Sequence, residues 1–239
     1  MFGAISHISA SYFSFHMRFQ PVEQGKPFSS AGIILYNDKE GKYLNRSRFY
    51  VSYAWHASLS RKLQFSAGLS VGGMNYSVEG TPLSGDGSDT KVDGAVGISF
   101  YSDAFHVGLS FGQIFNSKVQ PLEEITVLSP FINMYANRKF LFNENFLFSP
   151  SFTARIPFIN ESGDKLNPLF DMNLLIELRK KLLISSGIHN NSMMIIAAGI
   201  KGLSISHGEL GIMVSYAFPG LRKTLIRTNY GEIGIHYSF

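Results

Sequence analysis

The chain has 239 residues, which is enough for one large β domain or two small ones, and it contains no cysteine. Only 16% of the residues are charged, and the net charge of +4 comes without any dense run of lysine and arginine. These values rule out a disulfide framework and cysteine-based zinc sites, and they argue against nucleic-acid binding. No apolar run reaches the roughly 20 residues that a transmembrane helix needs.

Apolar residues alternate with small or polar ones along the whole chain, which is the period of a β-strand with two different faces. In 49–59, for example, Phe49, Val51 and Tyr53 fall on one face while Ser52 and Ala54 fall on the other. The alternation predicts strands, in chain order, at 5–19, 29–37, 46–58, 62–77, 92–101, 104–115, 126–140, 146–157, 168–179, 182–189, 192–200, 208–218 and 229–239.

Strands in soluble proteins typically have about five or six residues, and most of these segments are longer. They match the roughly nine to eleven residues that a tilted strand needs to cross a bilayer. Residues 162–181 also show near-helical leucine spacing, but the clean alternation from Phe170 to Leu178 favours a strand there.

The connections between the predicted strands alternate between short and long. Outer-membrane barrels have short periplasmic turns and longer external loops, so this alternation predicts such a barrel. Two connections, 20–28 and 201–207, have medium length on the side where short turns are expected. The short turns are 59–61, 101–104, 142–145 and 179–181, and the long loops are 37–45, 78–91, 116–124, 157–167 and 219–228.

The fold class is therefore predicted as all-β, a transmembrane antiparallel β-barrel that forms a single outer-membrane domain over residues 1–239. The thirteen predicted strands are an odd number, whereas bacterial single-chain barrels have an even number. Residues 1–15 also lack the pattern of a signal peptide. Both points predict an upstream signal and one further strand, giving fourteen in the full-length protein; twelve remain if two segments are loops.

The last strand, 229–239, is predicted to close the barrel. Ile233, Ile235, Tyr237 and Phe239 fall on one face, with smaller or polar residues between them. A strand of this kind that ends on a terminal aromatic residue resembles the closing strand of bacterial outer-membrane barrels.

Charged residues at Arg155, Asp171, Glu177 and Arg179 lie on the polar faces of two neighbouring predicted strands. Charges inside a barrel must be paired or hydrated. We predict an inter-strand network that closes the lumen, and the lining of a selective pore is the alternative.

Other candidate sites are weak. His189, Asn190 and Ser192 belong to a residue trio that outer-membrane phospholipases use, but here they share one tight turn. Asp86, Asp89 and Asp93 lack the glutamate that would complete a calcium loop, and the seven histidines show no metal-binding spacing. We therefore predict no catalytic residues, no metal site and no cofactor.

Several segments, taken in order, resemble one known family. FSFHMRF (13–19), GIILYNDKEG (32–41), the long run 48–76, FSPSFTARIPF (148–158) and GEIGIHYSF (231–239) resemble the PorP/SprF family of Bacteroidetes outer-membrane proteins. The sequence departs from the family pattern at Gly231, where histidine is frequent, and at Tyr216-Ala217.

This resemblance implies a non-enzymatic outer-membrane barrel of the type IX secretion and gliding machinery, acting as an anchor or adaptor. The implied partners are outer-membrane lipid and other secretion components, among them a periplasmic peptidoglycan-binding lipoprotein or a large surface adhesin, with no nucleic acid. A passive channel for small solutes is the alternative function, and an outer-membrane hydrolase is less favoured. A soluble β-sandwich, which would need no detergent, also remains open.

Overall fold

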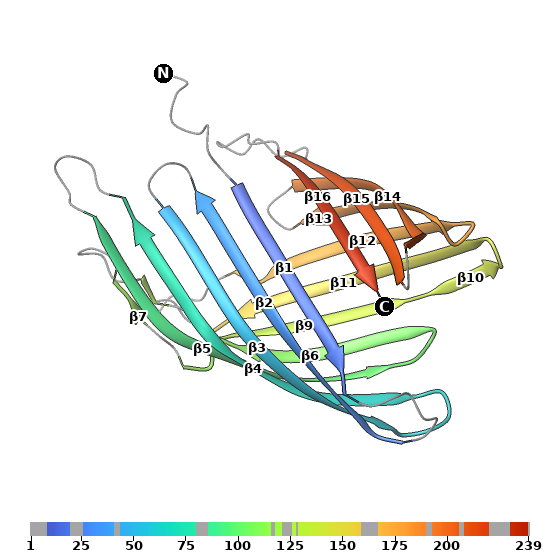
Figure 1. Ribbon diagram of the computed structural model, residues 1–239, viewed down its shortest axis with the longest axis horizontal. Helices are drawn as coiled ribbons and strands as arrows, with labels where there is room; N and C mark the ends of the chain where they lie inside the picture. The colour runs from blue at the N-terminus through green and yellow to red at the C-terminus, as the bar shows by residue number, and fades with distance from the viewer. Residues whose placement is uncertain are drawn as a thin grey trace. The chain divides into compact units, whose positions relative to one another are not determined.

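The computed structural model describes residues 9–19, 26–40, 44–79, 86–115, 118–120, 126–127, 129–158, 167–189, 193–205, 208–219 and 230–238. All regular secondary structure in these ranges is β-strand (Figure 1). None of the described residues forms a helix with the length and hydrophobicity that a membrane crossing requires.

The strands are numbered in chain order. They are β1 (Ser9–Arg18), β2 (Phe28–Glu40), β3 (Leu44–Ser58), β4 (Gln64–Val78), β5 (Gly87–Tyr101), β6 (Phe105–Gly112), β7 (Lys118–Val119), β8 (Thr126–Val127), β9 (Phe131–Arg138), β10 (Phe140–Asn143), β11 (Phe146–Pro157), β12 (Leu169–Leu178), β13 (Leu182–His189), β14 (Met193–Ile205), β15 (Gly208–Pro219) and β16 (Tyr230–Ser238).

Fourteen of these strands form one sheet with the order β1-β2-β3-β4-β5-β6-β9-β11-β12-β13-β14-β15-β16, and β10 pairs with β11. The short strands β7 and β8 pair only with each other. The thirteen strands along this path overlap the thirteen predicted ones. Within the predicted strand 126–140, Thr126–Val127 is instead β8 of the small sheet and Phe131–Arg138 is β9, while β10 (Phe140–Asn143) extends into the predicted turn 142–145. The helix considered for 162–181 is wrong, because Leu169–Leu178 is a strand.

The described strands belong to two compact units. Unit 1 comprises Met1–Phe100, Gly108–Asn133 and Ile156–Asn167, and it contains β1 to β5 as neighbours in the sheet. Unit 2 comprises Tyr101–Val107, Met134–Arg155 and Pro168–Phe239, and it contains β12 to β16. That residues 1–239 form a single domain stays a prediction.

Each unit has two chemically different faces because the cross-strand register aligns like residues. In unit 1, Phe15 lies opposite Ile33, Ile33 opposite Val51, and Val51 opposite Val71. All four side chains are exposed. We call the side of the sheet that carries this row the apolar face, and the opposite side the polar face.

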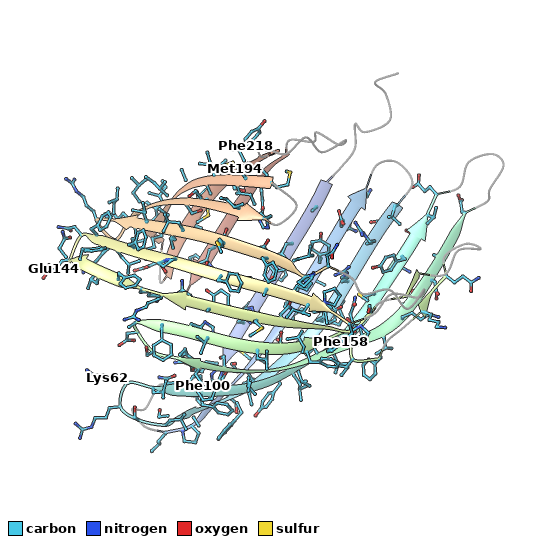
Figure 2. The ribbon with its side chains drawn as sticks, turned by 180° about the vertical axis from the view of Figure 1, so that it is seen from behind. Lys62, Phe100, Glu144, Phe158, Met194 and Phe218 are labelled. Atoms are coloured by element: carbon cyan, nitrogen blue, oxygen red, sulfur yellow. The ribbon has the colours of Figure 1, made fainter. Side chains whose placement is uncertain are left out.

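Unit 2 repeats the same arrangement. Its apolar face carries Ile176, Ile184, Ala198, Val214 and Ile233, each opposite the next across β12 to β16. The predicted alternation of the last strand is therefore present: Ile233 and Ile235 are each 72% exposed on this face. Side chains project from both faces of the sheet, as Figure 2 shows.

Three connections are shorter than predicted because their strands continue further. The predicted loop 78–91 shrinks to residues 79–86, since β5 already begins at Gly87. The predicted loop 37–45 shrinks to residues 41–43, since β2 and β3 remain paired up to Glu40 and Leu44. The medium connection 201–207 shrinks to 206–207 because β14 continues past an irregularity between Ile200 and Leu203. Gly202 lies there with a φ of 69°, a conformation that glycine adopts without strain.

Candidate functional site

The polar face of unit 1 carries a closely packed group of large side chains on β2 to β5. We call it the arginine–tyrosine cluster. Alternation along β3 directs Arg46, Arg48 and Tyr50 to this face, and neighbouring strands add further members. Its residues are Tyr36, Asp38, Arg46, Arg48, Tyr50, Met74, Tyr76 and Asp93.

Polar contacts join these side chains in pairs across the strands. The Arg46 Nη2 donates to Asp38 Oδ2 at 2.7 Å. The Tyr50 hydroxyl donates to Asp93 Oδ2 at 2.7 Å, although Asp93 is only 6% exposed. A buried carboxylate without a donor would cost several kcal/mol, so the Tyr50 hydrogen bond is what makes this position tolerable for Asp93.

Apolar packing also stabilises the arginine–tyrosine cluster. Met74 is completely buried, and it packs with Tyr76, Leu44 and Tyr50. Full burial of a side chain of this size contributes about 2–3 kcal/mol. The cluster is thus packed against the polar face, and its pairs contain no nucleophile beside a general base.

Gly72 explains how the Tyr50 ring fits against β4. A Cβ atom at Gly72 would lie 1.8 Å from the Phe49 carbonyl oxygen and 2.7 Å from Tyr50 Cδ1. Glycine is therefore required by the close approach of β3 and β4. Gly73, the next residue, has no such restriction, since its nearest neighbour would be the Lys91 carbonyl oxygen at 3.8 Å.

The polar face of unit 2 carries two cross-strand pairs of polar side chains. Asp171 on β12 accepts from His189 Nδ1 on β13 at 2.5 Å when that nitrogen carries the proton, and the two residues are opposite each other in register. Lys201 Nζ on β14 donates to Glu177 Oε2 on β12 at 2.7 Å. Lys201 thus reaches past β13, which lies between these two strands.

Two of the four predicted network residues therefore have partners that sequence reasoning missed, His189 and Lys201. His189 lies on the neighbouring strand β13 and Lys201 on β14, one strand further, so the only signal for them was the register, which a strand list does not provide. Arg155 lies on β11 opposite Leu169. The pairs that the structure forms with Asp171 and Glu177 are with His189 and Lys201. A network of Arg155, Asp171, Glu177 and Arg179 that closes the lumen stays a prediction.

Arg179 lies in the tight turn between β12 and β13. Its φ is 50° and that of Lys180 is 57°, and the turn is closed by a hydrogen bond from Lys181 N to Leu178 O at 3.0 Å. Two-residue hairpin turns with positive φ at both positions normally contain Asn-Gly. An arginine and a lysine in this conformation carry backbone strain.

The remaining predicted site residues are dispersed. Tyr237 lies opposite Leu210 in the pairing of β15 with β16, and Phe239 lies outside the described residues, as does Ser192 of the considered catalytic trio. Asp89 accepts from the Gln120 backbone N–H at 2.8 Å and pairs with Lys91.

The described residues contain no group of three or more acidic, histidine or cysteine side chains that could hold a metal ion. His16, His56 and His106 lie on the polar side of their strands, as expected for interior residues, and so does His189 beside Asp171. His56 Nε2 lies 3.0 Å from the Ser30 hydroxyl and stacks on Phe28, and His106 contacts Tyr135 edge-on. These contacts serve packing within the sheet.

Comparison with known families decides the class of protein. The family model for type IX secretion system membrane protein PorP/SprF matches residues 2–233. The chain belongs to the PorP/SprF family. This match confirms the resemblance seen in the sequence. It identifies the chain as a type IX secretion system membrane protein.

Comparison with solved structures supports the fold. The chain is similar to the CymD monoaromatic hydrocarbon channel, with a TM-score of 0.58 and 9% sequence identity, over 96% of this chain and 84% of that one. A search of curated protein sequences gave no significant match. The predicted fold class, a transmembrane antiparallel barrel, and the outer-membrane location are confirmed.

In such a barrel, outward residues contact lipid and inward residues face the interior. The exposed apolar face of this PorP/SprF protein is accordingly the lipid-facing side. Its polar face, with the arginine–tyrosine cluster, is the side that faces the interior.

Proposed function

We propose that this protein is a non-enzymatic adaptor or anchor of the type IX secretion machinery, which holds other secretion components at the outer membrane. The family assignment supports the general role. The observation that carries the finer proposal is the arginine–tyrosine cluster. There Met74 and Asp93 are buried on the face that a solute channel would need to keep open and hydrated.

The chemistry of the cluster supports docking over transport. Water-filled barrels line the interior with hydrated polar side chains. Here the Tyr50–Asp93 and Arg46–Asp38 contacts satisfy polar groups with one another, while Met74 is fully enclosed. Opening this region to a solute would require breaking both the polar pairs and the packing around Met74. An anchor does not need to open this region.

The proposed partners are other secretion components. The candidates implied by the family resemblance are a periplasmic peptidoglycan-binding lipoprotein and a large surface adhesin. Outer-membrane lipid is the surrounding partner on the apolar face.

The test is affinity purification of the tagged protein in mild detergent, followed by mass spectrometry. An unrelated outer-membrane barrel of similar size, purified in parallel, serves as the control. We expect secretion components to be enriched with this protein and absent from the control. If the two preparations contain the same proteins, the adaptor proposal is wrong, while the fold assignment is unaffected.

A passive channel is the second candidate, because the CymD structure that shares this fold is a channel. Planar-bilayer recordings distinguish the two. An adaptor should give no steady conductance, whereas a channel should conduct in the wild type. Met74→Ala together with Tyr50→Ala, which empties part of the arginine–tyrosine cluster, should raise conductance if the cluster is what closes the interior.

A further inference from the structure

The lipid-facing side of unit 1 is hollowed on β1 to β5, which lie side by side in Figure 1. The hollow has a volume of about 620 Å³. Its floor is formed by Phe13, Leu35, Phe49 and the bare backbone of Gly73. Because Gly73 has no side chain, the apolar face is lower at this point than beside it. We call this hollow the β1–β5 groove.

A row of uncharged polar residues runs along one side of the groove. In register, Ser11 lies opposite Asn37, Asn37 opposite Ser47, and Ser47 opposite Asn75. The row continues to β5, where Asn75 Nδ2 donates to Thr90 Oγ1 at 2.7 Å. One step further along each strand, the same face carries the large apolar residues of the floor.

This row does not fit the apolar band that contacts lipid tails, and it fits the headgroup level at the edge of that band. The Asn37 Nδ2 donates to the Ser47 hydroxyl at 3.0 Å. An amide oxygen can accept up to two hydrogen bonds. The groove therefore has an apolar floor and, beside it, neutral groups able to form further hydrogen bonds.

The ligand that combines these properties is a membrane lipid, because the groove is continuous with the face that already contacts lipid. Its headgroup should be rich in hydroxyl groups. Phosphate groups select arginine and lysine, and the single charged residue lining the groove, Arg48, donates to Tyr76 on the polar face. Sugar hydroxyls, in contrast, pair well with neutral amides and hydroxyls.

We propose that the β1–β5 groove binds one outer-membrane glycolipid. Its acyl chain lies on Phe13, Leu35 and Phe49, and its sugars form hydrogen bonds with the side chains of Asn37 and Asn75. The row lies next to the β2–β3 connection, at the end of the strands opposite the short β3–β4 turn. If the short turns are periplasmic, as predicted, this is the outer leaflet.

Gly73 allows a selective test. A leucine at this position would extend into the groove, because the nearest atom to its Cβ would be the Lys91 carbonyl oxygen at 3.8 Å. Gly231 is the matched control on the lipid-facing side of unit 2. It lies opposite the exposed Tyr216, and its Cβ would likewise meet nothing closer than the Ser215 carbonyl oxygen at 3.7 Å.

The experiment is native mass spectrometry of the full chain, delipidated in mild detergent and then incubated with either an uncharged glycosyl diacylglycerol or phosphatidylethanolamine. We expect the wild type and Gly231→Leu to retain the glycosyl diacylglycerol, and Gly73→Leu to lose about tenfold in affinity because the floor is occupied. Asn37→Ala with Asn75→Ala should also lose about tenfold, through the missing hydrogen bonds.

Heat-modifiable mobility on gels checks that each variant is folded. If Gly73→Leu fails this check, the asparagine double variant, which adds no volume, decides alone. Retention of the glycosyl diacylglycerol by both variants at wild-type affinity would show that the groove is not the site. Equal binding of phosphatidylethanolamine and the glycosyl diacylglycerol by the wild type would overturn the assignment to a glycolipid.

Discussion

The two units build their polar faces from the same alternating pattern but stabilise them differently. In unit 1 the face is filled by large side chains, with Met74 completely buried in the arginine–tyrosine cluster. In unit 2 the buried positions on this face are small, such as Ala197 and Ala217, and the large polar residues form the pairs Asp171–His189 and Glu177–Lys201. One face depends mainly on packing and the other mainly on charge.

The difference teaches that alternation specifies which face a residue occupies but not how that face is held together. Packing of a buried side chain contributes a few kcal/mol and is insensitive to salt. Partly exposed ion pairs contribute less, about 1 kcal/mol or below, and weaken as salt screens them. The two units should therefore respond differently to substitution and to ionic strength.

The largest effect is expected at Gly72, which sets the spacing under the arginine–tyrosine cluster. Gly72→Ala should destabilise the protein by about 3 kcal/mol or more, because the new Cβ would lie 1.8 Å from the Phe49 carbonyl oxygen. Gly73→Ala, one residue further and open, is the matched control and should change stability little. Urea unfolding in detergent micelles, followed by tryptophan fluorescence, measures both; equal stability of the two variants would contradict the packing account.

Met74→Ala tests the packed face directly. Removing a fully buried methionine should cost about 2–4 kcal/mol, and the cost should be the same at low and high salt. The corresponding change to a side chain on the lipid-facing side, Val71→Ala, should cost less, because Val71 is exposed within the sheet. A small effect at Met74 would mean that the cluster relaxes around the cavity.

Glu177→Gln tests the charged face. Loss of the pair with Lys201 should cost about 0.5–1 kcal/mol, because Lys201 is partly exposed and the pair is screened by water. The difference in unfolding free energy between the wild type and Glu177→Gln should be smaller in about 0.5 M salt than in dilute buffer. A salt-independent difference would show that Glu177 acts through packing, and the contrast between the units would disappear.

The smallest effect, with the opposite sign, is expected in the β12–β13 turn. Arg179→Asn with Lys180→Gly should stabilise the protein by about 1 kcal/mol. Asparagine and glycine adopt the positive φ values of this turn, 50° and 57°, with less strain than arginine and lysine. The same exchange at Arg61 and Lys62, in the β3–β4 connection where no positive φ occurs, should not stabilise. Unfolding in urea compares the two; equal gains would point to charge removal as the cause.

Much of the fold could be predicted from the sequence. The strands from β1 to β16 along the main path, the exposed position of Ile233 and Ile235, and the family all followed from alternation and ordered motifs. The lengths of three connections, 37–45, 78–91 and 201–207, could not be predicted. Continuation of β2 and β3 to residues 40 and 44 depends on pairing across the hairpin, where Arg46 meets Asp38.

The candidate site was less predictable. Asp171 and Glu177 were recognised as interior charges, but their partners His189 and Lys201 were not, and neither was the contact of Tyr50 with Asp93. A list of strands in chain order does not show which residues lie opposite each other. A shift of one residue in register would exchange the two faces and separate every one of these pairs.

The sequence by itself determined the class of this protein, because the alternation of apolar and polar residues is a local property that each strand carries independently. Only the tertiary structure decided which polar side chains meet, where the interior face is filled, and that a hollow on β1 to β5 combines an apolar floor with a neutral polar row. The physical reason is that these features depend on register between strands. Register is set by hydrogen bonding and packing between segments that are distant in the chain.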